Sequence, residues 1–467
     1  MVFGPEVLER YPHGWFVCKS ERIDSGGTRD KRVQCLDLAG RAYQCLDESA
    51  RATLRFGTKP AATGKSSARE YDDQYQRTAP TMPQVLHAAI IVENLPLSLY
   101  VKPPILIDSE QELAHSLHAL STAAWVALDT EFVRERTYRA RLCLVQIATP
   151  DMLVCVDPLR VDVAPLLEAL YQPTLLKVLH SARQDLEVLY DVRGAVLSPI
   201  FDTQIAAALT GPEDQIGYGA LVERLTGHRL DKHATRTDWS QRPLTDAQLA
   251  YARDDVHYLR EVYAQLAARL EALGRREWLD EECAAMTDPA LYAADPAEAW
   301  RRIRAGQHLG SDAQQRLAAL AEWRERTARE RDLPRGWIVK DPALIELASN
   351  PPPNLAALAQ HAGMTPAILR KCGSELLARL NAAAVSPPRR LWENPARPDI
   401  AQAALLKRWS DHVKALADAE GLSATLLATR HDLQELLLTG GGRLAQGWRK
   451  GFLGDELSRE RAGAMQT

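Results

Sequence analysis

Two acidic residues, Asp129 and Glu131, directly follow the apolar run 124–128. On a β-strand, residues two positions apart point to the same face, so the two carboxylates project together. Negative charges that close repel each other, and each raises the pKa of the other unless a cation lies between them. The pair therefore indicates a cation site. The alternative that this pair alone leaves open is a strand end that enters solvent.

A third acid, Asp185, is expected in the first or second turn of a helix. The apolar run 175–179 predicts a buried strand that ends near His180, and Ser181 is expected to cap the helix that follows. Asp185 then lies near the carboxyl edge of the sheet, where α/β folds form their ligand crevices. The alternative is that this acid compensates the dipole of its own helix.

Asp255 and Tyr251 lie beside an apolar stripe on a later predicted helix. Residues four apart are neighbours on a helix surface, so the Tyr251 hydroxyl is expected one turn from the Asp255 carboxylate. An acid beside a core stripe is costly unless it is paired or bound to a metal. A purely structural helix is the alternative. The stripe consists of Ala252, Val256, Leu259 and Tyr263.

The four acids together form the oxygen ligand set that Mg²⁺ and Mn²⁺ prefer, and no cysteine pair accompanies them as a zinc site would need. Two such ions about 4 Å apart stabilise the attacking and leaving oxygens when a phosphodiester bond is displaced. A tyrosine hydroxyl one helical turn from a metal ligand is placed to orient the attacking water. The set predicts a two-metal site with the ligands Asp129, Glu131, Asp185 and Asp255, and with Tyr251 as a further catalytic residue.

Strands and helices alternate around these residues. Helices are expected from Asp108-Ser109 to Leu120, from about residue 163, and onward to about residue 273. Hairpin strands combined with alternating helices predict an α/β domain with a mixed sheet and flanking helices. The expected strands are 105–107, 124–128, 142–148, 152–156 and 175–179, with Pro150-Asp151 as a hairpin turn.

After Gly310 only helical signals remain. An amphipathic helix begins near Leu317, and prolines interrupt the helices that follow it. A proline-rich stretch, 386–398, separates the segment 311–386 from a second helical segment, 399–462. We therefore expect two small all-α modules behind the α/β domain.

The first 85 residues differ from the rest of the chain. They contain a polar tract, 58–81, and little sustained periodicity, with short strands indicated only around 15–18 and 33–38. Gly64-Lys65-Ser66 is similar to the end of a phosphate loop but lacks the first glycine of that motif. A disordered or poorly structured extension, 1–85, is the expectation.

Composition narrows the class of protein. An apolar content of 46% and a charged content of 25% are typical of a globular chain, and 467 residues leave room for several domains. The net charge of −4 does not indicate a nucleic-acid binder, so any such contact must be local. Scattered cysteines without a CxxC pair favour a cytoplasmic protein with reduced thiols. We expect no membrane span, no secretory signal and no obligate protein partner.

The three acidic motifs resemble those of the DEDD exonucleases of the tyrosine subclass: Asp-x-Glu after a strand, His-x4-Asp at a helix start and Tyr-x3-Asp on a later helix. The surrounding residues are similar to ribonuclease D, which implies a ribonuclease H-like core. The segment 331–344 is similar to an HRDC domain, and 447–450 lies in a degenerate second copy. The matching stretches in the α/β segment are 128–134, Thr137-Tyr138, 144–147, 201–204 and 238–244.

This resemblance covers residues 104–462 and implies an exonuclease domain at 104–290, an HRDC domain at 311–386 and a degenerate HRDC-like domain at 399–462. It implies a 3′→5′ exoribonuclease that releases 5′-monophosphates, with tRNA precursors carrying 3′ extensions as its expected RNA partners. In this family the residue matched by Asp129 bridges both ions. HRDC modules help to hold structured RNA, so deletion after Gly310 is expected to weaken binding of structured RNA more than cleavage of short single strands.

Several other residues are candidates for contacts with the substrate or for structural roles. Thr130, His180, Trp239 and Arg242 are the candidate substrate-binding residues; a polar strand end is the alternative for His180, and a packed loop for Trp239 and Arg242. Asp202 is expected to be a structural or helix-start acid, and His257, Arg253 and Asp254 are expected on solvated helix faces. Trp323, Trp337 and Trp448 are expected in the cores of the helical modules.

Two other functions remain as alternatives. A DNA 3′-5′ exonuclease would use the same acids, but the chain lacks helicase and polymerase segments, and matched RNA and DNA oligonucleotides would discriminate the two. An inactive RNA-binding scaffold is disfavoured because all four acids and the tyrosine are present, whereas decayed sites usually lose a ligand.

Overall fold

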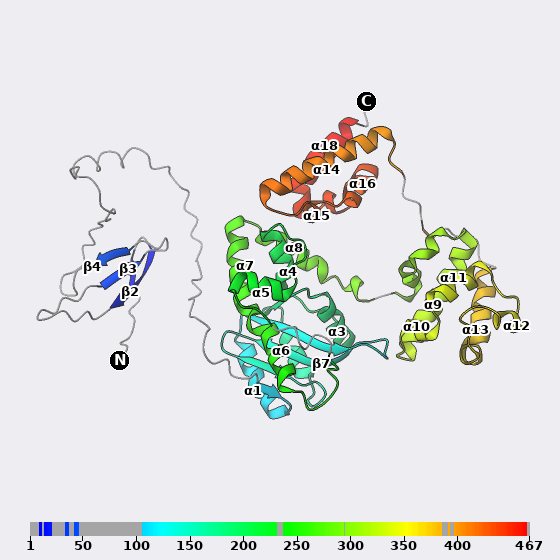
Figure 1. Ribbon diagram of the computed structural model, residues 1–467, viewed down its shortest axis with the longest axis horizontal. Helices are drawn as coiled ribbons and strands as arrows, with labels where there is room; N and C mark the ends of the chain where they lie inside the picture. The colour runs from blue at the N-terminus through cyan, green and yellow to red at the C-terminus, as the bar shows by residue number, and fades with distance from the viewer. Residues whose placement is uncertain are drawn as a thin grey trace, which may run out of the picture. The chain divides into compact units, whose positions relative to one another are not determined.

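The computed structural model describes residues 105–230, 237–293, 295–384, 391–392 and 397–464, together with four short strands between residues 9 and 45 (Figure 1). The chain divides into two units, residues 1–91 and 92–467.

The first unit contains one antiparallel sheet whose strands follow one another in sequence order. Its strands are β1 (Glu9–Tyr11), β2 (Gly14–Ser20), β3 (Val33–Leu36) and β4 (Ala42–Cys45). β2 and β3 fall where the sequence indicates short strands. Gly64-Lys65-Ser66 lies outside the described residues, and the expectation of a poorly structured extension over 1–85 stays a prediction.

The second unit begins with a six-stranded sheet in the order β10-β9-β6-β7-β8-β5. The pairs β6–β7 and β7–β8 are antiparallel, whereas β5–β8, β6–β9 and β9–β10 are parallel, so the predicted mixed sheet is confirmed. The strands are β5 (Ile105–Ile107), β6 (Trp125–Val133), β7 (Arg141–Ala148), β8 (Leu153–Val156), β9 (Leu176–Leu179) and β10 (Ile200–Asp202).

Helices flank this sheet, which explains why its central strands read as nearly continuous apolar runs. Val126, Leu128 and Val145 are fully buried among them. The helices are α1 (Glu110–Ser121), α2 (Ala164–Leu170), α3 (Arg183–Arg193), α4 (Thr203–Thr210), α5 (Tyr218–Thr226), α6 (Asp246–His257), α7 (Leu259–Leu273) and α8 (Arg276–Met286).

The apolar stripe predicted for one helix spans two, because α6 ends at His257 and α7 begins at Leu259. The start of α6 is fixed by a capping box. Thr245 Oγ1 accepts the Gln248 N–H at 3.2 Å, and Gln248 Oε1 accepts the Thr245 N–H at 2.9 Å. This cap sets the rotation of the helix that carries Tyr251 and Asp255.

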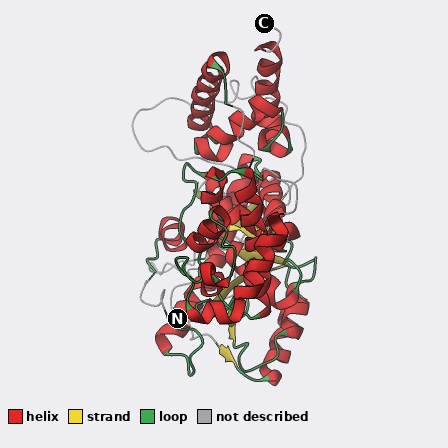
Figure 2. Cartoon of the chain, turned by 90° about the vertical axis from the view of Figure 1, so that its right-hand side faces the viewer, coloured by secondary structure: helices red, strands yellow, loops and turns green. Residues whose placement is uncertain are grey.

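Helices also make up the rest of the unit (Figure 2). The 3₁₀ segments η1 (Pro289–Leu291), η2 (Pro296–Arg302) and η3 (Arg304–His308) precede the first module. That module contains α9 (Ser311–Glu330), α10 (Arg335–Ile338), α11 (Asp341–Ser349), α12 (Leu355–Leu358) and α13 (Pro366–Ala384). The second contains α14 (Ile400–Glu420), α15 (Ala424–Leu427), α16 (Arg430–Thr439), η4 (Arg443–Ala445), α17 (Gly447–Arg449), the π-helical turn η5 (Lys450–Gly454) and α18 (Asp455–Ala464). Over the described part of the chain, no helix has the length and apolarity needed to cross a membrane.

The tryptophans of the helical modules have different surroundings. Trp323 is buried in the core of the first module, as expected. Trp337 is 59% exposed, so its predicted place in the core is wrong; the four-residue helix α10 buries Ile338 instead. Trp448 is partly buried and packs against residues of both the second module and the α/β domain.

The second module contacts the α/β domain through α8. The Trp448 ring stacks on Trp278 with centroids 4.2 Å apart, and its indole N–H donates to Glu282 at 2.9 Å. Gly447 has a φ of +59°, and a Cβ there would lie 1.6 Å from a carboxylate oxygen of Glu281. A side chain at this position would push the Glu281 carboxylate away from the Trp448 N–H that it accepts, so glycine suits this contact between the two domains.

Candidate active site

Asp129 and Glu131 lie on β6 in the middle of the sheet. In the register with β7, Asp129 is opposite Gln146 and Glu131 is opposite Leu144. The register shifts between Glu131 and Phe132, a local irregularity of the kind that often re-aims side chains beside a site. The alternation of a strand places both carboxylates on one face, as the sequence predicts.

Helix α6 brings Asp255 to the same face. Carboxylate oxygens of Asp129, Glu131 and Asp255 all lie within 4.8 Å of one another. Ala252 and Val256, on the stripe beside Asp255, are fully buried, which anchors the helix against the sheet. Residues more than 120 positions apart in the chain thus form one compact acidic group.

Asp185 lies in the first turn of α3 and is 7% exposed. The Thr130 hydroxyl donates to its Oδ1 at 2.6 Å, so Asp185 reaches β6 at the residue between the other two acids. It stands outside the close group of three, yet its charge contributes to the raised pKa of Asp129. The four predicted acids therefore gather at one place, three closely and one beside them.

The turn that presents Asp185 differs from the prediction. The N-cap of α3 is Ala182, and Ser181, which was expected to cap the helix, has a φ of +57° and gives no side-chain cap. The carboxylate of Asp202 instead accepts the Ser181 and Ala182 N–H groups at 3.2 and 2.8 Å. It also accepts the Gln204 N–H at 2.8 Å as the N-cap of α4, which confirms its predicted structural role.

Among the described residues, no basic side chain lowers the pKa of any of the four acids. Burial raises the pKa of Glu131 to about 9, with the charges of Asp129 and Asp185 as the next causes. Burial, and then Asp185 and Asp255, hold the pKa of Asp129 well above its ordinary value. Burial also raises the pKa of Asp255, assisted by Glu131, and raises that of Asp185 to about 6 against the opposing hydrogen bond from Thr130.

Gln146 supplies a further reason to expect a bound cation. It is fully buried, and neither atom of its amide has a hydrogen-bond partner among the described residues. Its neighbours across the strands are Asp129 on β6 and Cys155 on β8. An unpaired buried amide costs about 1–3 kcal/mol per unmet group. A polar side chain at this position beside the acids therefore fits a hydrated cation that would bind the amide. Oxygen ligands of this kind suit a hard divalent ion.

Tyr251 lies one turn before Asp255 on α6 and is partly buried. Burial, followed by the charges of Asp255 and Glu131, raises the pKa of its hydroxyl. The hydroxyl is therefore within electrostatic reach of the acids and stays protonated at neutral pH. Its ring packs against Trp239, with centroids 6.1 Å apart.

Trp239 and Arg242, two of the candidate substrate contacts, lie in a packed loop, which is the alternative that the sequence left open for them. Trp239 is 4% exposed, in a cluster with Leu244. Arg242 donates to both carboxylate oxygens of Asp157, at 2.5 and 2.7 Å, and to the Cys143 carbonyl at 2.7 Å. Its remaining N–H groups reach the carbonyls of Trp239 and Gln241 at 2.8 and 2.7 Å. All five donors of this guanidinium are thus used within the protein.

The other candidates lie closer to the acids. The Thr130 hydroxyl is buried and engaged with Asp185. His180 is partly buried, its Nδ1 is 3.0 Å from Thr203 Oγ1, and burial lowers its pKa. Its place at a polar strand end matches the structural alternative, and contact of Thr130 or His180 with substrate stays a prediction.

The expected solvated helix faces are only partly found. His257 is buried, and burial, followed by Arg260 and Arg253, lowers its pKa to about 4, so the solvated position predicted for it is wrong. Arg253 and Asp254 form a half-buried ion pair at 2.7 Å.

Tyr218 belongs to this region and was not anticipated from the sequence. Its hydroxyl donates to the Asp254 carbonyl at 2.9 Å, and its ring lies 5.5 Å from that of His180. Burial raises its pKa, and the charges of Asp255 and Asp129 are the next causes. Nothing local marks this residue, because its position depends on α5 packing against α7, which brings the Tyr218 hydroxyl to the Asp254 carbonyl of α6.

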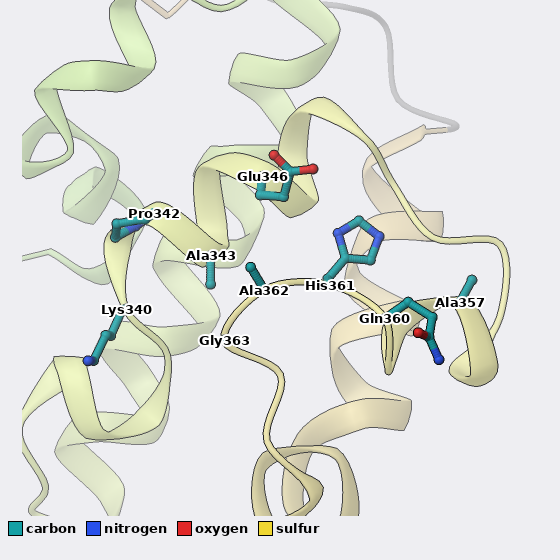
Figure 3. A pocket seen from close by; sticks show the side chains of 9 residues that line it. All are labelled: Lys340, Pro342, Ala343, Glu346, Ala357, Gln360, His361, Ala362 and Gly363. Atoms are coloured by element: carbon teal, nitrogen blue, oxygen red, sulfur yellow. The ribbon is translucent and has the colours of Figure 1, made fainter.

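A separate pocket lies in the first helical module (Figure 3). It has a volume of about 550 Å³ and is lined by residues at the start of α11 and in the turn after α12, including Lys340, Glu346 and His361. None of the four acids lines it, so the candidate active site is the acidic group on the sheet.

Two family models match parts of the chain. The 3′-5′ exonuclease family matches residues 104–271, and the HRDC domain family matches residues 313–380. The second helical module lies outside both matches, so its kinship with HRDC domains stays a prediction.

Individual relatives extend the similarity over most of the chain. A ribonuclease D of Gluconacetobacter diazotrophicus is 40% identical over 377 residues, covering 78% of this chain and 94% of the relative. One of Granulibacter bethesdensis is 37% identical, covering 76% and 91%. The crystal structure of Escherichia coli RNase D, described as an exoribonuclease involved in structured RNA processing, is 32% identical with a TM-score of 0.70, covering 78% of this chain and 98% of that one. The chain belongs to the ribonuclease D family and is a 3′-5′ exoribonuclease.

Proposed function

We propose that this enzyme hydrolyses RNA from the 3′ end by a two-metal mechanism at the acidic group and releases 5′-monophosphates. The observation that carries the proposal is the gathering of Asp129, Glu131 and Asp255 within 4.8 Å, with Asp185 beside them. Carboxylates that close are stable in ionised form only with cations among them. Mg²⁺ or Mn²⁺ fits the all-oxygen set.

The residues divide naturally between two ions. Asp129, Glu131 and Asp255 would hold one ion, and Asp129 together with Asp185 would hold the other, which makes Asp129 the shared ligand. When bound, such a pair polarises the scissile phosphate and acidifies a water molecule. Thr130 fixes the Asp185 carboxylate through its 2.6 Å hydrogen bond, so this acid keeps one orientation whatever occupies the site.

Tyr251 is the proposed partner of the attacking water. Since burial and nearby acids keep its hydroxyl protonated, it acts by hydrogen bonding and not as a base. Its ring is held by Trp239, which limits the positions the hydroxyl adopts. The proton released by the water passes to solvent or to the leaving 3′-oxygen, which completes the hydrolysis.

The proposed substrates are structured RNAs with single-stranded 3′ ends, tRNA precursors above all. Two features support this: the family relationship to an enzyme of structured RNA processing and the presence of an HRDC domain. We also propose a cytoplasmic location. The cysteines that the structure describes, Cys143, Cys155, Cys283 and Cys372, are unpaired thiols, which fits a reducing compartment.

A ladder assay with end-labelled RNA tests the proposal. With 5′-labelled RNA and Mg²⁺ we expect products that shorten by single nucleotides, whereas 3′-labelled RNA releases labelled mononucleotide at once. EDTA should abolish both patterns. A matched DNA oligonucleotide should be degraded much more slowly. Full activity in EDTA would contradict the two-metal mechanism, and equal rates on DNA would contradict the RNA assignment.

A further inference from the structure

The loop between β6 and β7 carries a tyrosine that docks on the first helical module. The Tyr138 hydroxyl donates to Glu325 of α9. The same oxygen accepts hydrogen bonds from Arg329 Nε at 2.9 Å and from Arg335 Nη2 at 3.0 Å. A single side chain of the catalytic domain is thus held by three residues about 190 positions later in the chain.

Glu325 is the centre of this contact and is 1% exposed. Arg335 donates to both of its oxygens, at 2.5 and 2.9 Å, and Arg302 donates at 3.2 Å. Burial alone would raise the pKa of this carboxyl, but the bonds from Arg335 and Tyr138 lower it to about 2. Glu325 therefore stays ionised over the working pH range, and its hydrogen bonds are the charge-assisted kind.

Asp332 holds the backbone of the same loop. Its Oδ1 accepts the N–H groups of Tyr138 and Arg139, both at 3.1 Å. The residue has a φ of +46°, a backbone conformation that side chains adopt only when their surroundings hold them. The Arg335 guanidinium also lies over the Tyr138 ring at 4.6 Å. Side chain and backbone of the loop are both fixed by the module.

The other end of the loop is tied to the catalytic domain itself. Arg134 donates to Glu187 at 2.8 Å and lies 3.7 Å from Asp191, both on α3. That helix presents Asp185, and β6 presents Asp129 and Glu131 just before the loop. The loop therefore runs from the acidic group to the helical module with a fixed point at each end.

We propose that the first helical module acts as a clamp on the β6–β7 hairpin, with Tyr138 as a positioning residue for the acids of β6. The register of β6 on β7 shifts directly after Glu131, which is where strand pairing is least constrained by its own hydrogen bonds. Anchoring the hairpin tip holds that irregular segment, and hence the carboxylates, in one arrangement. The effect of the clamp on catalysis rests on the proposed metal site. The anchoring of the hairpin by the module does not depend on that site.

This clamp changes what deletion of the module should do. The resemblance to the family favours a module that holds structured RNA, so short single strands would be cleaved normally without it. With the clamp, removal of residues after Gly310 also removes Glu325, Arg329 and Arg335 and so releases Tyr138. We therefore expect cleavage of short strands to fall as well.

The test uses the full chain with Tyr138→Phe, which keeps the ring and its packing and removes only the hydroxyl. Glu325→Gln keeps the shape and removes the charge. Arg326→Ala is the control, because it breaks an exposed ion pair with Glu322 on the same helix and touches no part of the clamp. Loss of a buried hydrogen bond to a charged group corresponds to a change of roughly 10-fold or more in an equilibrium.

For both clamp variants we expect hydrogen exchange of the hairpin amides 134–140 to rise by about 10-fold or more. We expect kcat on a short single-stranded RNA to fall by a similar factor with KM nearly unchanged, and Mg²⁺ binding measured by calorimetry to weaken. The double variant should lose little more than either single one, since the two groups act as a unit. Arg326→Ala should match the wild type.

Unchanged exchange at 134–140 in Tyr138→Phe would overturn the clamp. Faster exchange with unchanged kcat and unchanged Mg²⁺ binding would overturn its role in positioning the acids. A rise in KM for structured RNA alone would show that the contact serves RNA binding instead, which also overturns the proposal. If the wild type needed no metal, the proposed mechanism would fail while the exchange measurement still decided the clamp.

Discussion

Substitution of Glu131 by glutamine should stabilise the protein when no metal is present. The carboxylate lies against Asp129, and burial is the main reason that its pKa rises from an ordinary 4.5 to about 9. A glutamine amide has the same shape and is neutral. It therefore needs no proton to avoid a buried negative charge, and it does not repel the Asp129 carboxylate. The same substitution removes a proposed metal ligand, so metal-induced stabilisation should shrink.

The magnitude follows from the two pKa values. An acid whose pKa is raised on folding contributes stability that is full below pH 4.5 and is lost as the pH rises toward 9. At pH 7 the loss spans 2.5 pH units, from 4.5 to 7, at about 1.4 kcal/mol per unit, which gives at most about 3.5 kcal/mol. Glu131→Gln recovers this amount. The gain should be absent below pH 4.5 and should grow through neutral pH.

Thermal unfolding in EDTA at pH 5, 7 and 8 measures the effect, with and without Mg²⁺ added back. Roughly 2–4 °C of change in Tm is expected per kcal/mol for a domain of this size. Glu135→Gln, an exposed glutamate on the same hairpin, is the matched control and should leave Tm unchanged. A Glu131→Gln protein that is no more stable than wild type at pH 8 in EDTA would refute the reasoning, because it would mean that neither burial nor the neighbouring acids destabilise the ionised Glu131 carboxylate.

The remaining predictions concern catalysis and metal. Turnover should vanish in EDTA and return with Mg²⁺ or Mn²⁺ but poorly with Ca²⁺, which is larger and less strict in geometry; activity sustained by Ca²⁺ alone would count against the site. Asp129→Asn, at the shared ligand, should lower kcat by about 10³-fold or more in steady-state assays of folded protein; retention of a third of the activity would contradict that role. Tyr251→Phe should lower single-turnover cleavage by about 10²–10⁴-fold with RNA affinity nearly unchanged, whereas unchanged turnover would remove Tyr251 from the site. Gln146→Leu should weaken Mg²⁺ binding, measured by calorimetry, by about 10–100-fold if the amide orients Asp129 or a metal-bound water; a variant with wild-type Mg²⁺ affinity would make the amide irrelevant.

The acidic group was largely predictable because each acid sits on an element with a strong local signal. An apolar run before Asp129, a strand and helix start around Asp185, and an amphipathic stripe beside Asp255 each appear in the sequence within a few residues. The rules of α/β folds then bring the carboxyl ends of neighbouring strands together. The prediction that Ser181 caps the helix was wrong, because the carboxylate that accepts the Ser181 N–H belongs to Asp202, on another strand. A local pattern cannot reveal a cap supplied from elsewhere.

The contacts between domains lie beyond local patterns for the same physical reason. Tyr138 and Glu325 are 187 positions apart. Tyr138 belongs to a stretch that matches the family, but no local pattern pairs it with Glu325. Arg242 is the converse case, since a basic residue near an aromatic one suggests RNA, whereas its partner Asp157 is 85 positions earlier and consumes its charge. A buried carboxylate without a partner is costly, so it binds the nearest complementary group. An arginine or tyrosine within its reach is therefore held inside the protein and is less available to the substrate. In this enzyme Asp157 and Glu325 are such groups, and each holds its partner, Arg242 or Tyr138, by hydrogen bonds within the protein.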